Sequence, residues 1–454
     1  MRLFSTTLEK TLFYLLLFSI PFEVKKLLWQ WGGFRVEWLS GFLWASDFLI
    51  IGLFLCWFLR ARYSGFKLKF DLPDYFLIGF FIVAGLSASG AGIKALSIYH
   101  LFKLAEFIGI YFYIKYNYGI IFNFNTGLFV LVGAGLIQSI IAIGQSFRQA
   151  GFGLKIIGES PSLSPYSPGV AAFVADGEKF MRAYGTTPHP NVLAVFFLLA
   201  LFSFYWLYFS PFLKKNDDIV PMAKVVFYKY GLAIYSLILF AFFLTFSRTM
   251  VVLWGAAVFT HLLFLSGLKG NQFWRDNKKR ILNIATLSIV VVVIFSIFYW
   301  PQIKSRITIS GDDEAVSQRI YYNKIAGSVS KDSPIFGVGI GQFVPKFMKQ
   351  APGMYFALYQ PVHNIYLLVL SEIGYLGLGM FLIFLILTLR GFFKKISSPI
   401  FHNRSFVVFI FAILAIGLFD HFLLTLQPGR MIFWVMLGLM GATTYAPNLR
   451  SPKN

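Results

Sequence analysis

Basic side chains recur where a polar stretch of this sequence meets a long apolar run. These residues are Arg182, His189, Arg248, His363 and Arg430. If the apolar runs are helices that begin there, each N-terminus carries a partial positive charge and free backbone N–H groups. A cation beside a helix N-terminus is mildly unfavourable, so several together indicate a bound anion such as phosphate. The alternative is that the arginine side chains extend to the membrane surface and bind lipid headgroups.

His363 is the residue best suited to move a proton. It lies in the stretch PVHNIYLLVLSEIG, where a long polar segment meets an apolar run. A helix N-terminus disfavours the imidazolium form, so we expect a neutral imidazole that can accept a proton near pH 7. The alternative is a structural histidine at the helix start, with Asn364 as a turn residue.

Other polar residues lie within or beside the apolar runs. Asp420 could orient Arg430 or His363, or form a structural pair, because an unpaired carboxylate near membrane depth is costly. Glu372 is expected to be buried with a partner, and Arg319 either contacts an acceptor or is solvated. No group of His, Asp or Glu has the spacing of a metal site, so we expect no metal and no cofactor.

The elements that carry these residues are predicted to be membrane helices. Of the 454 residues, 57% are hydrophobic and 13% are charged, whereas a soluble domain has about 25% charged residues. Recurrent apolar runs of about 20 residues predict an all-α polytopic membrane protein with about 12 transmembrane helices. They form a single transmembrane domain over residues 1–454. The single cysteine, Cys56, excludes a disulfide within the chain.

The predicted spans alternate with segments of contrasting charge. They lie near residues 11–28, 41–59, 72–89, 95–116, 120–144, 191–209, 228–247, 249–267, 281–300, 363–389, 405–425 and 431–446. Most Lys and Arg residues lie in segments that the positive-inside rule assigns to the cytoplasm, with both termini. The net charge of +21 therefore mostly sets orientation and does not indicate nucleic acid.

Two long segments then lie outside the cytoplasm. They span residues 145–190, about 45 residues, and residues 301–362, about 60 residues. Long loops of this kind are more often functional than passive. In the second, SQRIYYNKIAGSVS predicts a short amphipathic helix whose apolar face includes Ile320, Ile325 and Val329, with Tyr321 and Tyr322.

Four segments, in this order, resemble the motifs of the O-antigen ligase and O-antigen polymerase superfamily. They are RAYGTTPHPNVLA (182–194), TFSRTM (245–250), QRIYYNKIAGSVSKDSPIFGVGIGQF (318–343) and HNIYLLVLSEIGYLGL (363–378). The resemblance covers roughly residues 180–445, and the first 145 residues match in hydropathy only. Tyr322 stands about where the family often has Trp.

Members of that superfamily transfer a glycan from an undecaprenyl-diphosphate carrier to an acceptor hydroxyl, at the outer face of the bacterial cytoplasmic (inner) membrane. The resemblance implies that Arg182 and Arg248 hold the diphosphate and that His363 is the general base. No metal is needed, because arginines can neutralise the leaving group, and a one-step transfer inverts the anomeric carbon. Further candidates for substrate binding are Arg319, Asn364, His189, Asn191, Arg430 and Asp420.

The resemblance leaves three kinds of acceptor open. These are a lipid A core sugar (a ligase of lipopolysaccharide biosynthesis), the end of another glycan (a polymerase), and a protein side chain (a protein O-oligosaccharyltransferase). A lipid-linked glycan flippase or other transporter is the alternative activity, although its charges would be spread on both sides of the midplane. A non-catalytic assembly partner would not need basic residues at helix ends. The expected partners are the lipid-linked donor, the acceptor and membrane lipids, without nucleic acid.

Overall fold

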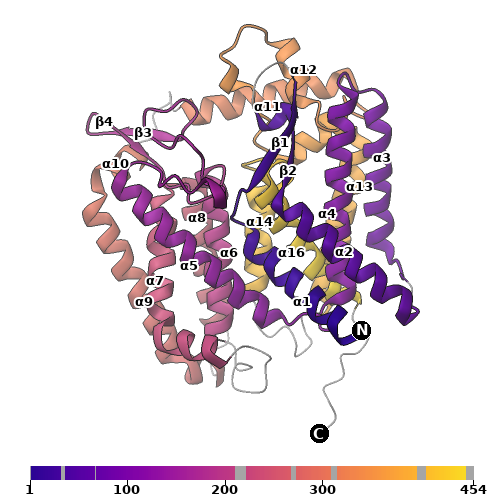
Figure 1. Ribbon diagram of the computed structural model, residues 1–454. Helices are drawn as coiled ribbons and strands as arrows, with labels where there is room; N and C mark the ends of the chain where they lie inside the picture. Colours follow the sequence, from indigo (N-terminus) through magenta and orange to yellow (C-terminus); the bar gives the residue numbers. More distant parts are fainter. Residues whose placement is uncertain are drawn as a thin grey trace.

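Long helices pack side by side into a bundle (Figure 1). The structure is a computed structural model and describes residues 2–31, 36–66, 68–209, 221–266, 272–307, 314–395 and 405–445. The long helices are α1 (Arg2–Ser19), α2 (Ala45–Ser64), α3 (Leu72–Ser89), α4 (Lys94–Asn117), α5 (Phe124–Arg148), α6 (Pro190–Phe209), α7 (Pro221–Leu244), α8 (Arg248–Ser266), α9 (Gln272–Phe298), α13 (Ile365–Lys395), α14 (Ser405–Ile416) and α16 (Gln427–Tyr445).

The helices confirm a polytopic membrane protein. Within the described ranges, 7 helices are long and apolar enough to cross a membrane, namely α3, α4, α5, α6, α7, α9 and α13. Shorter apolar stretches cover Arg248–Thr260 of α8 and Phe406–Ile416 of α14. The total of about 12 spans therefore stays a prediction, which the order and position of the long helices fit.

The first two predicted spans differ from the structure. The span expected over residues 11–28 ends early, because α1 stops at Ser19, ahead of Pro21, and a proline disfavours helix in the residue before it. Lys25–Gln30 instead forms strand β1, which pairs antiparallel with β2 (Ser40–Trp44) beside the short 3-10 helix Glu37–Leu39. Helix α2 begins at Ala45 rather than residue 41.

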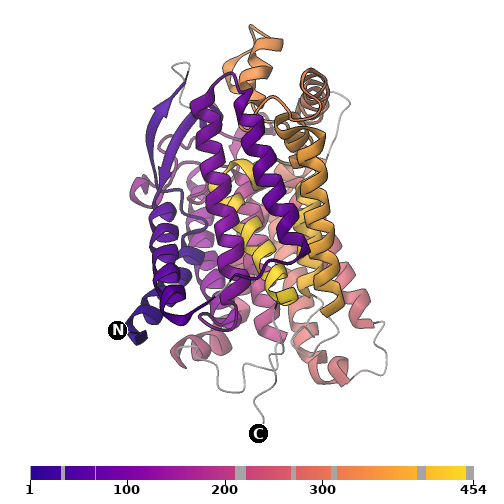
Figure 2. The same cartoon turned by 90° about the vertical axis from the view of Figure 1, so that its right-hand side faces the viewer.

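The two long polar segments lie at the end of the bundle opposite the N-terminus (Figures 1 and 2). The first contains the 3-10 helix Lys155–Ile157 and a hairpin of β3 (Ala172–Ala175) and β4 (Glu178–Met181). The second contains α10 (Trp300–Ile307), α11 (Glu314–Asp332), α12 (Phe343–Gln350) and the 3-10 helix Phe356–Leu358. Both segments are therefore folded, and they share one end of the molecule.

Helix α11 is amphipathic, but its buried face is not quite the expected one. Tyr322, Ala326 and Val329 are buried and belong to a small core with Phe343 and Phe347 of α12. Ile320 is 52% exposed. It lies two residues before Tyr322, and two residues turn an α-helix by more than half of its circumference. Ile320 was therefore wrongly assigned to the apolar face.

The N-terminal helices support the helices that carry the motifs. Helix α4 packs along α16, and α3 packs along α13. Residues three apart on a helix share one face, and Lys103 Nζ of α4 lies 2.8 Å from Glu106 Oε2, and also 2.7 Å from Asp47 Oδ2 of α2. The first 145 residues thus contribute walls and charges around the motif-bearing helices.

Helix α13 is broken at Gly374, which has φ 75° and ψ −176°. Backbone groups that lose their helical partners at this break are hydrogen-bonded by the polar segment before α13. Tyr375 N donates to Pro334 O at 2.8 Å, and Gly339 N donates to the backbone oxygen of Glu372 at 3.0 Å. The Glu372 carboxylate also accepts from Gly341 N, at 2.8 Å. Irregular backbone at membrane depth needs such partners. Glu372 and Gly374 therefore anchor the segment that precedes α12.

We expect Gly374→Ala to destabilise the fold. The φ of Gly374 lies in a region that only glycine adopts readily, and an added Cβ would stand 2.2 Å from Ile335 O. Backbone strain of this kind costs about 1–3 kcal/mol before the clash is counted. Gly379→Ala, in the same helix and with no atom within 4 Å of the added Cβ, is the matched control. Thermal unfolding in detergent should show a lower Tm for Gly374→Ala alone.

Candidate functional site

Arg182 is held in place by both neighbouring motifs. It follows β4 directly, and its side chain is 8% exposed. Its Nε donates to the backbone oxygen of Thr245 at 2.6 Å, and its Nη2 donates to Asn191 Oδ1 at 2.6 Å. The guanidinium is therefore fixed between the end of the first polar segment, the start of α6 and the turn before α8.

Asn191 links three parts of the site. Besides Arg182, its Oδ1 accepts from Ser247 Oγ at 3.1 Å, and its Nδ2 donates to Asp420 Oδ2 at 2.9 Å. His189 accepts the Asn191 backbone N–H on its Nδ1 at 3.1 Å, as a helix cap does. The His-Pro-Asn segment thus starts α6 and connects Arg182 to Asp420.

Three arginines gather at this end of the bundle. Arg248 is the first residue of α8, and Arg306 of α10 lies over the ring of Phe173, 5.4 Å from its centroid. Burial, and then the charge of Arg306, lower the pKa of Arg182 to about 9, to which Arg248 also contributes. Arg182 stays protonated near neutral pH. Grouped like charges are costly unless an anion offsets them, so the site is suited to a diphosphate.

Sequence reasoning missed Arg306. Its signal was available, because it is a basic residue in the second polar segment, close to the end of α9. What the sequence does not contain is the packing of α10 against β3, which brings Arg306 toward Arg182.

His363 lies against aromatic and acidic neighbours just before α13. Its ring stacks on Tyr322 with centroids 5.4 Å apart and meets the edge of the His421 ring at 4.9 Å. His363, Asp420 and His421 each offer one side-chain nitrogen or oxygen that could bind a metal ion, and these three atoms all lie within 4.8 Å of one another. Among the described residues, nothing hydrogen-bonds His363 Nδ1, although that atom is buried. An unpaired buried nitrogen is costly and suits a substrate hydroxyl as its partner.

Asp420 has fixed partners in this cluster. It accepts from the backbone N–H of His421 at 2.8 Å as well as from Asn191. Burial opposes its ionisation, but the facing His363 and His421 and the Asn191 hydrogen bond lower the pKa of Asp420 below its ordinary value. A carboxylate is therefore present to stabilise an imidazolium at His363.

The three candidate residues that remain occupy different positions. Asn364 Oδ1 caps α13 by accepting from Tyr366 N at 2.9 Å and Leu367 N at 3.1 Å. Arg319 of α11 is half-buried and close enough to lower the pKa of His363 and His189. Arg430 lines a separate cavity, where its Nε donates to Leu424 O at 2.8 Å. Asp420 therefore interacts with His363 rather than with Arg430.

If His363 is the general base that the resemblance implies, the pH profile of transfer should show that it is neutral at physiological pH. Burial and Arg319 lower the pKa of His363 below 6.5, while Asp420 raises it. The active, neutral form then persists down to a pH below 6.5, so kcat/KM for transfer should be flat near pH 7 and fall only in more acidic buffer. Arg319→Gln should move the acid limb to higher pH, and Asp420→Asn should move it to lower pH. An unmoved acid limb in both variants would contradict the assignment.

The comparison with known families bears on the central part of the chain. A family model described as O-antigen ligase matches residues 233–382, which include Arg248, Arg306 and His363. No curated protein matches the chain significantly. The family match includes three of the four motifs, those at 245–250, 318–343 and 363–378, and supports the resemblance of this part of the chain to the O-antigen ligase and polymerase superfamily.

Proposed function

We propose that this protein transfers a glycan from an undecaprenyl-diphosphate carrier to an acceptor hydroxyl, at the outer face of the bacterial cytoplasmic membrane. Both termini lie in the cytoplasm, and the reaction needs no metal or cofactor. One observation carries the proposal: Asn191 joins Arg182 to Asp420, which lies beside His363. A group of cations and a proton acceptor thus belong to one buried site.

The arginines bind the donor in this proposal. Arg306 and Arg248 are close enough to Arg182 to lower its pKa, and a diphosphate bound by the three arginines would offset their mutual repulsion. The N-termini of α6 and α8 add backbone N–H groups and partial positive charge there. As the bond from C1 of the sugar to the diphosphate breaks, negative charge grows on the leaving group. Fixed cations stabilise that charge most, because they need no reorganisation during the reaction.

His363 activates the acceptor. An acceptor hydroxyl donates its hydrogen bond to the unpaired Nδ1 and then transfers the proton to it. The oxygen attacks C1, a new glycosidic bond forms, and the lipid diphosphate leaves with the bonding electrons. Asp420 stabilises the imidazolium, and the stacked ring of Tyr322 holds His363 in place. A single displacement inverts the configuration at C1.

The test is transfer by the purified protein in detergent. The donor is an undecaprenyl-diphosphate glycan, and the acceptors are lipid A core oligosaccharide, a second lipid-linked glycan and an acceptor protein. We expect a new glycosidic product and free undecaprenyl diphosphate, at the same rate with and without EDTA. Loss of the product in EDTA would contradict the metal-free reaction. Movement of the carrier across liposomes without product would favour the flippase.

The comparison with and without EDTA is needed because three side chains of the site could bind a metal ion. His363, Asp420 and His421 are close enough together for one cation to touch all three. However, Asp420 already accepts two hydrogen bonds, and His421 Nδ1 is paired with Thr425 Oγ1 at 2.7 Å. Added Zn²⁺ should therefore inhibit transfer by occupying His363 and should not support it.

A further inference from the structure

A cavity lies between α4, α13 and α16, and Thr425 in its wall contacts His421 of the site described above. Its empty volume is about 810 Å³, which includes open solvent at its mouth. Its wall is mostly apolar, but it also includes polar or amphipathic residues, namely Glu37, Trp38, His100, Lys103, Glu372, Thr425 and Arg430. The reaction proposed above uses none of these residues directly.

Arg430 has an unmet hydrogen-bonding capacity in this cavity. Its side chain is 5% exposed, and its Nη1 has no partner among the described residues. The nearby carboxylates are already engaged: Glu37 pairs with Lys25, and Glu372 accepts from the backbone N–H groups of Gly341 and Phe343. A buried guanidinium nitrogen without a partner is costly, so a ligand that accepts a hydrogen bond is expected there.

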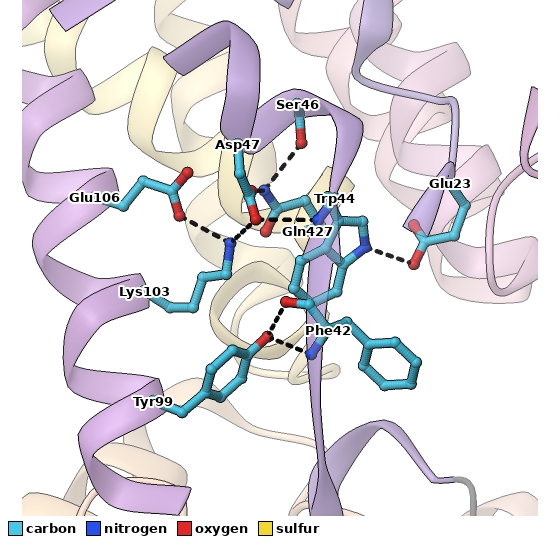
Figure 3. Close-up of polar contacts among 9 residues, drawn as sticks. All are labelled: Glu23, Phe42, Trp44, Ser46, Asp47, Tyr99, Lys103, Glu106 and Gln427. Atoms are coloured by element: carbon cyan, nitrogen blue, oxygen red, sulfur yellow. Dashed lines mark hydrogen bonds and ion pairs between the residues drawn. The ribbon is translucent and has the colours of Figure 1, made fainter. Parts of the chain in front are cut away.

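Unpaired acceptors lie in the adjoining polar cluster (Figure 3). Lys103 pairs with Asp47 and Glu106, and Gln427 donates to Ser46 and Asp47. Glu106 Oε1 and Gln427 Oε1 nevertheless have no partner among the residues described. Gln427 lies one turn before Arg430 on α16. Neither Glu106 nor Gln427 lines the cavity, so the donor that a ligand in the cavity meets is Arg430 Nη1, which suits a hydroxyl oxygen as its acceptor.

The charges favour a neutral ligand over an anion. Glu37 and Glu372 line the same cavity as Arg430 and Lys103, so the opposite charges of the lining balance and give no preference for an anionic group. Trp38 supplies an apolar surface with a ring that can pack against the C–H face of a sugar. An uncharged, hydroxyl-rich sugar fits this combination better than a phosphate or a peptide.

The cavity is linked to the proposed base through Thr425 and His421. Thr425, in its wall, starts a continuous hydrogen-bonded chain that runs through His421, Asp420 and Asn191 to Arg182. His363 packs against the middle of this chain, at His421. A ligand in the cavity and a diphosphate at Arg182 would therefore lie along one hydrogen-bonded chain, which packs against His363.

We propose that this cavity is the acceptor subsite and that it binds an uncharged, hydroxyl-bearing sugar residue of the acceptor, with Arg430 donating to a hydroxyl. The inference rests on the proposed function, and it favours a glycan over a protein side chain as the acceptor. Arg430 is a binding residue here and takes no part in the bond-making step.

Two-substrate kinetics test the assignment. Arg430→Gln should raise the KM for the acceptor about tenfold or more, because a hydrogen bond from a charged group is lost. The KM for the donor, and kcat at saturating acceptor, should stay within about twofold of wild type. Arg430→Lys should restore part of the acceptor affinity. Arg280→Gln is the matched control, since Arg280 also donates to a backbone oxygen, that of Tyr208. A raised donor KM with an unchanged acceptor KM would overturn the proposal.

A binding measurement separates this inference from the proposed function. Cys56 is the only cysteine, so Cys56→Ser with Leu424→Cys places one thiol in the cavity wall. Lipid A core oligosaccharide or a released lipid-linked glycan should slow labelling by a neutral thiol reagent, and undecaprenyl diphosphate should not. Protection without transfer supports the subsite and contradicts the proposed function. Transfer without protection, or equal protection by the carrier, overturns the subsite alone.

Discussion

Replacing His363 by glutamine should lower the rate of glycan transfer by about 10²- to 10⁴-fold, the usual contribution of a general base. Glutamine keeps the volume and a polar end but cannot take up the proton. Its effect should appear in the rate constant of a single turnover, measured with purified protein and saturating donor. Binding of the undecaprenyl-diphosphate donor should be unchanged, because Arg182 and Arg248 remain.

His189→Asn is the comparison for that experiment. His189 also lies at a helix start, but its Nδ1 already accepts the backbone N–H of Asn191. Asparagine can serve as such a cap, so most of the transfer activity should survive. If His363→Gln and His189→Asn lose the same modest amount of activity, His363 is a structural residue like its neighbour, and the base lies elsewhere.

Removing the diphosphate-binding arginines should be nearly as damaging. Arg182→Ala or Arg248→Ala should each cost about 10²- to 10³-fold in kcat/KM, the scale of one lost donor to a developing negative charge. The double variant should lose less than the product of the two effects, because both side chains serve one diphosphate. Equilibrium binding of undecaprenyl diphosphate should fall in parallel.

Two further variants separate charge from geometry at this position. Arg182→Lys keeps a cation but cannot donate to both Thr245 O and Asn191 Oδ1 in the same way, so it should recover only part of the activity. Arg148→Ala removes an exposed arginine at the end of α5, in contact with Phe152, and should change nothing. Donor binding that survives Arg182→Ala with Arg248→Ala would remove the basis for a diphosphate site.

Helix periodicity and helix direction accounted for much of this site in advance. Arg182 and Arg248 precede parallel apolar runs, and His363 precedes a third, so the sequence alone placed them at one end of a bundle. The i, i+3 spacing of Lys103 and Glu106 within one apolar run likewise accounts for their ion pair. Each of these predictions depends on local sequence and on the alternation of spans.

The unpredicted features depend on contacts between distant segments. Asn191 was a candidate contact, but its place between Arg182 and Asp420 needs α6 to start beside the turn after α14. The sequence analysis grouped Arg430 with the other basic residues at helix starts. In the structure Arg430 lies in the first turn of α16, which packs on α4, and it lines a different cavity. Hydropathy does not report which helices become neighbours, so it could not divide the cations into two sites.

The break at Gly374 has a practical consequence for exchanging parts between related proteins. The second polar segment does not end where α13 begins, because its backbone completes the hydrogen bonding of that helix two turns further along. A chimera joined at residue 364 would separate donors from acceptors that belong together and would misfold at the seam. A junction after Lys395, which transfers α13 together with the segment before it, keeps these donors and acceptors in one piece.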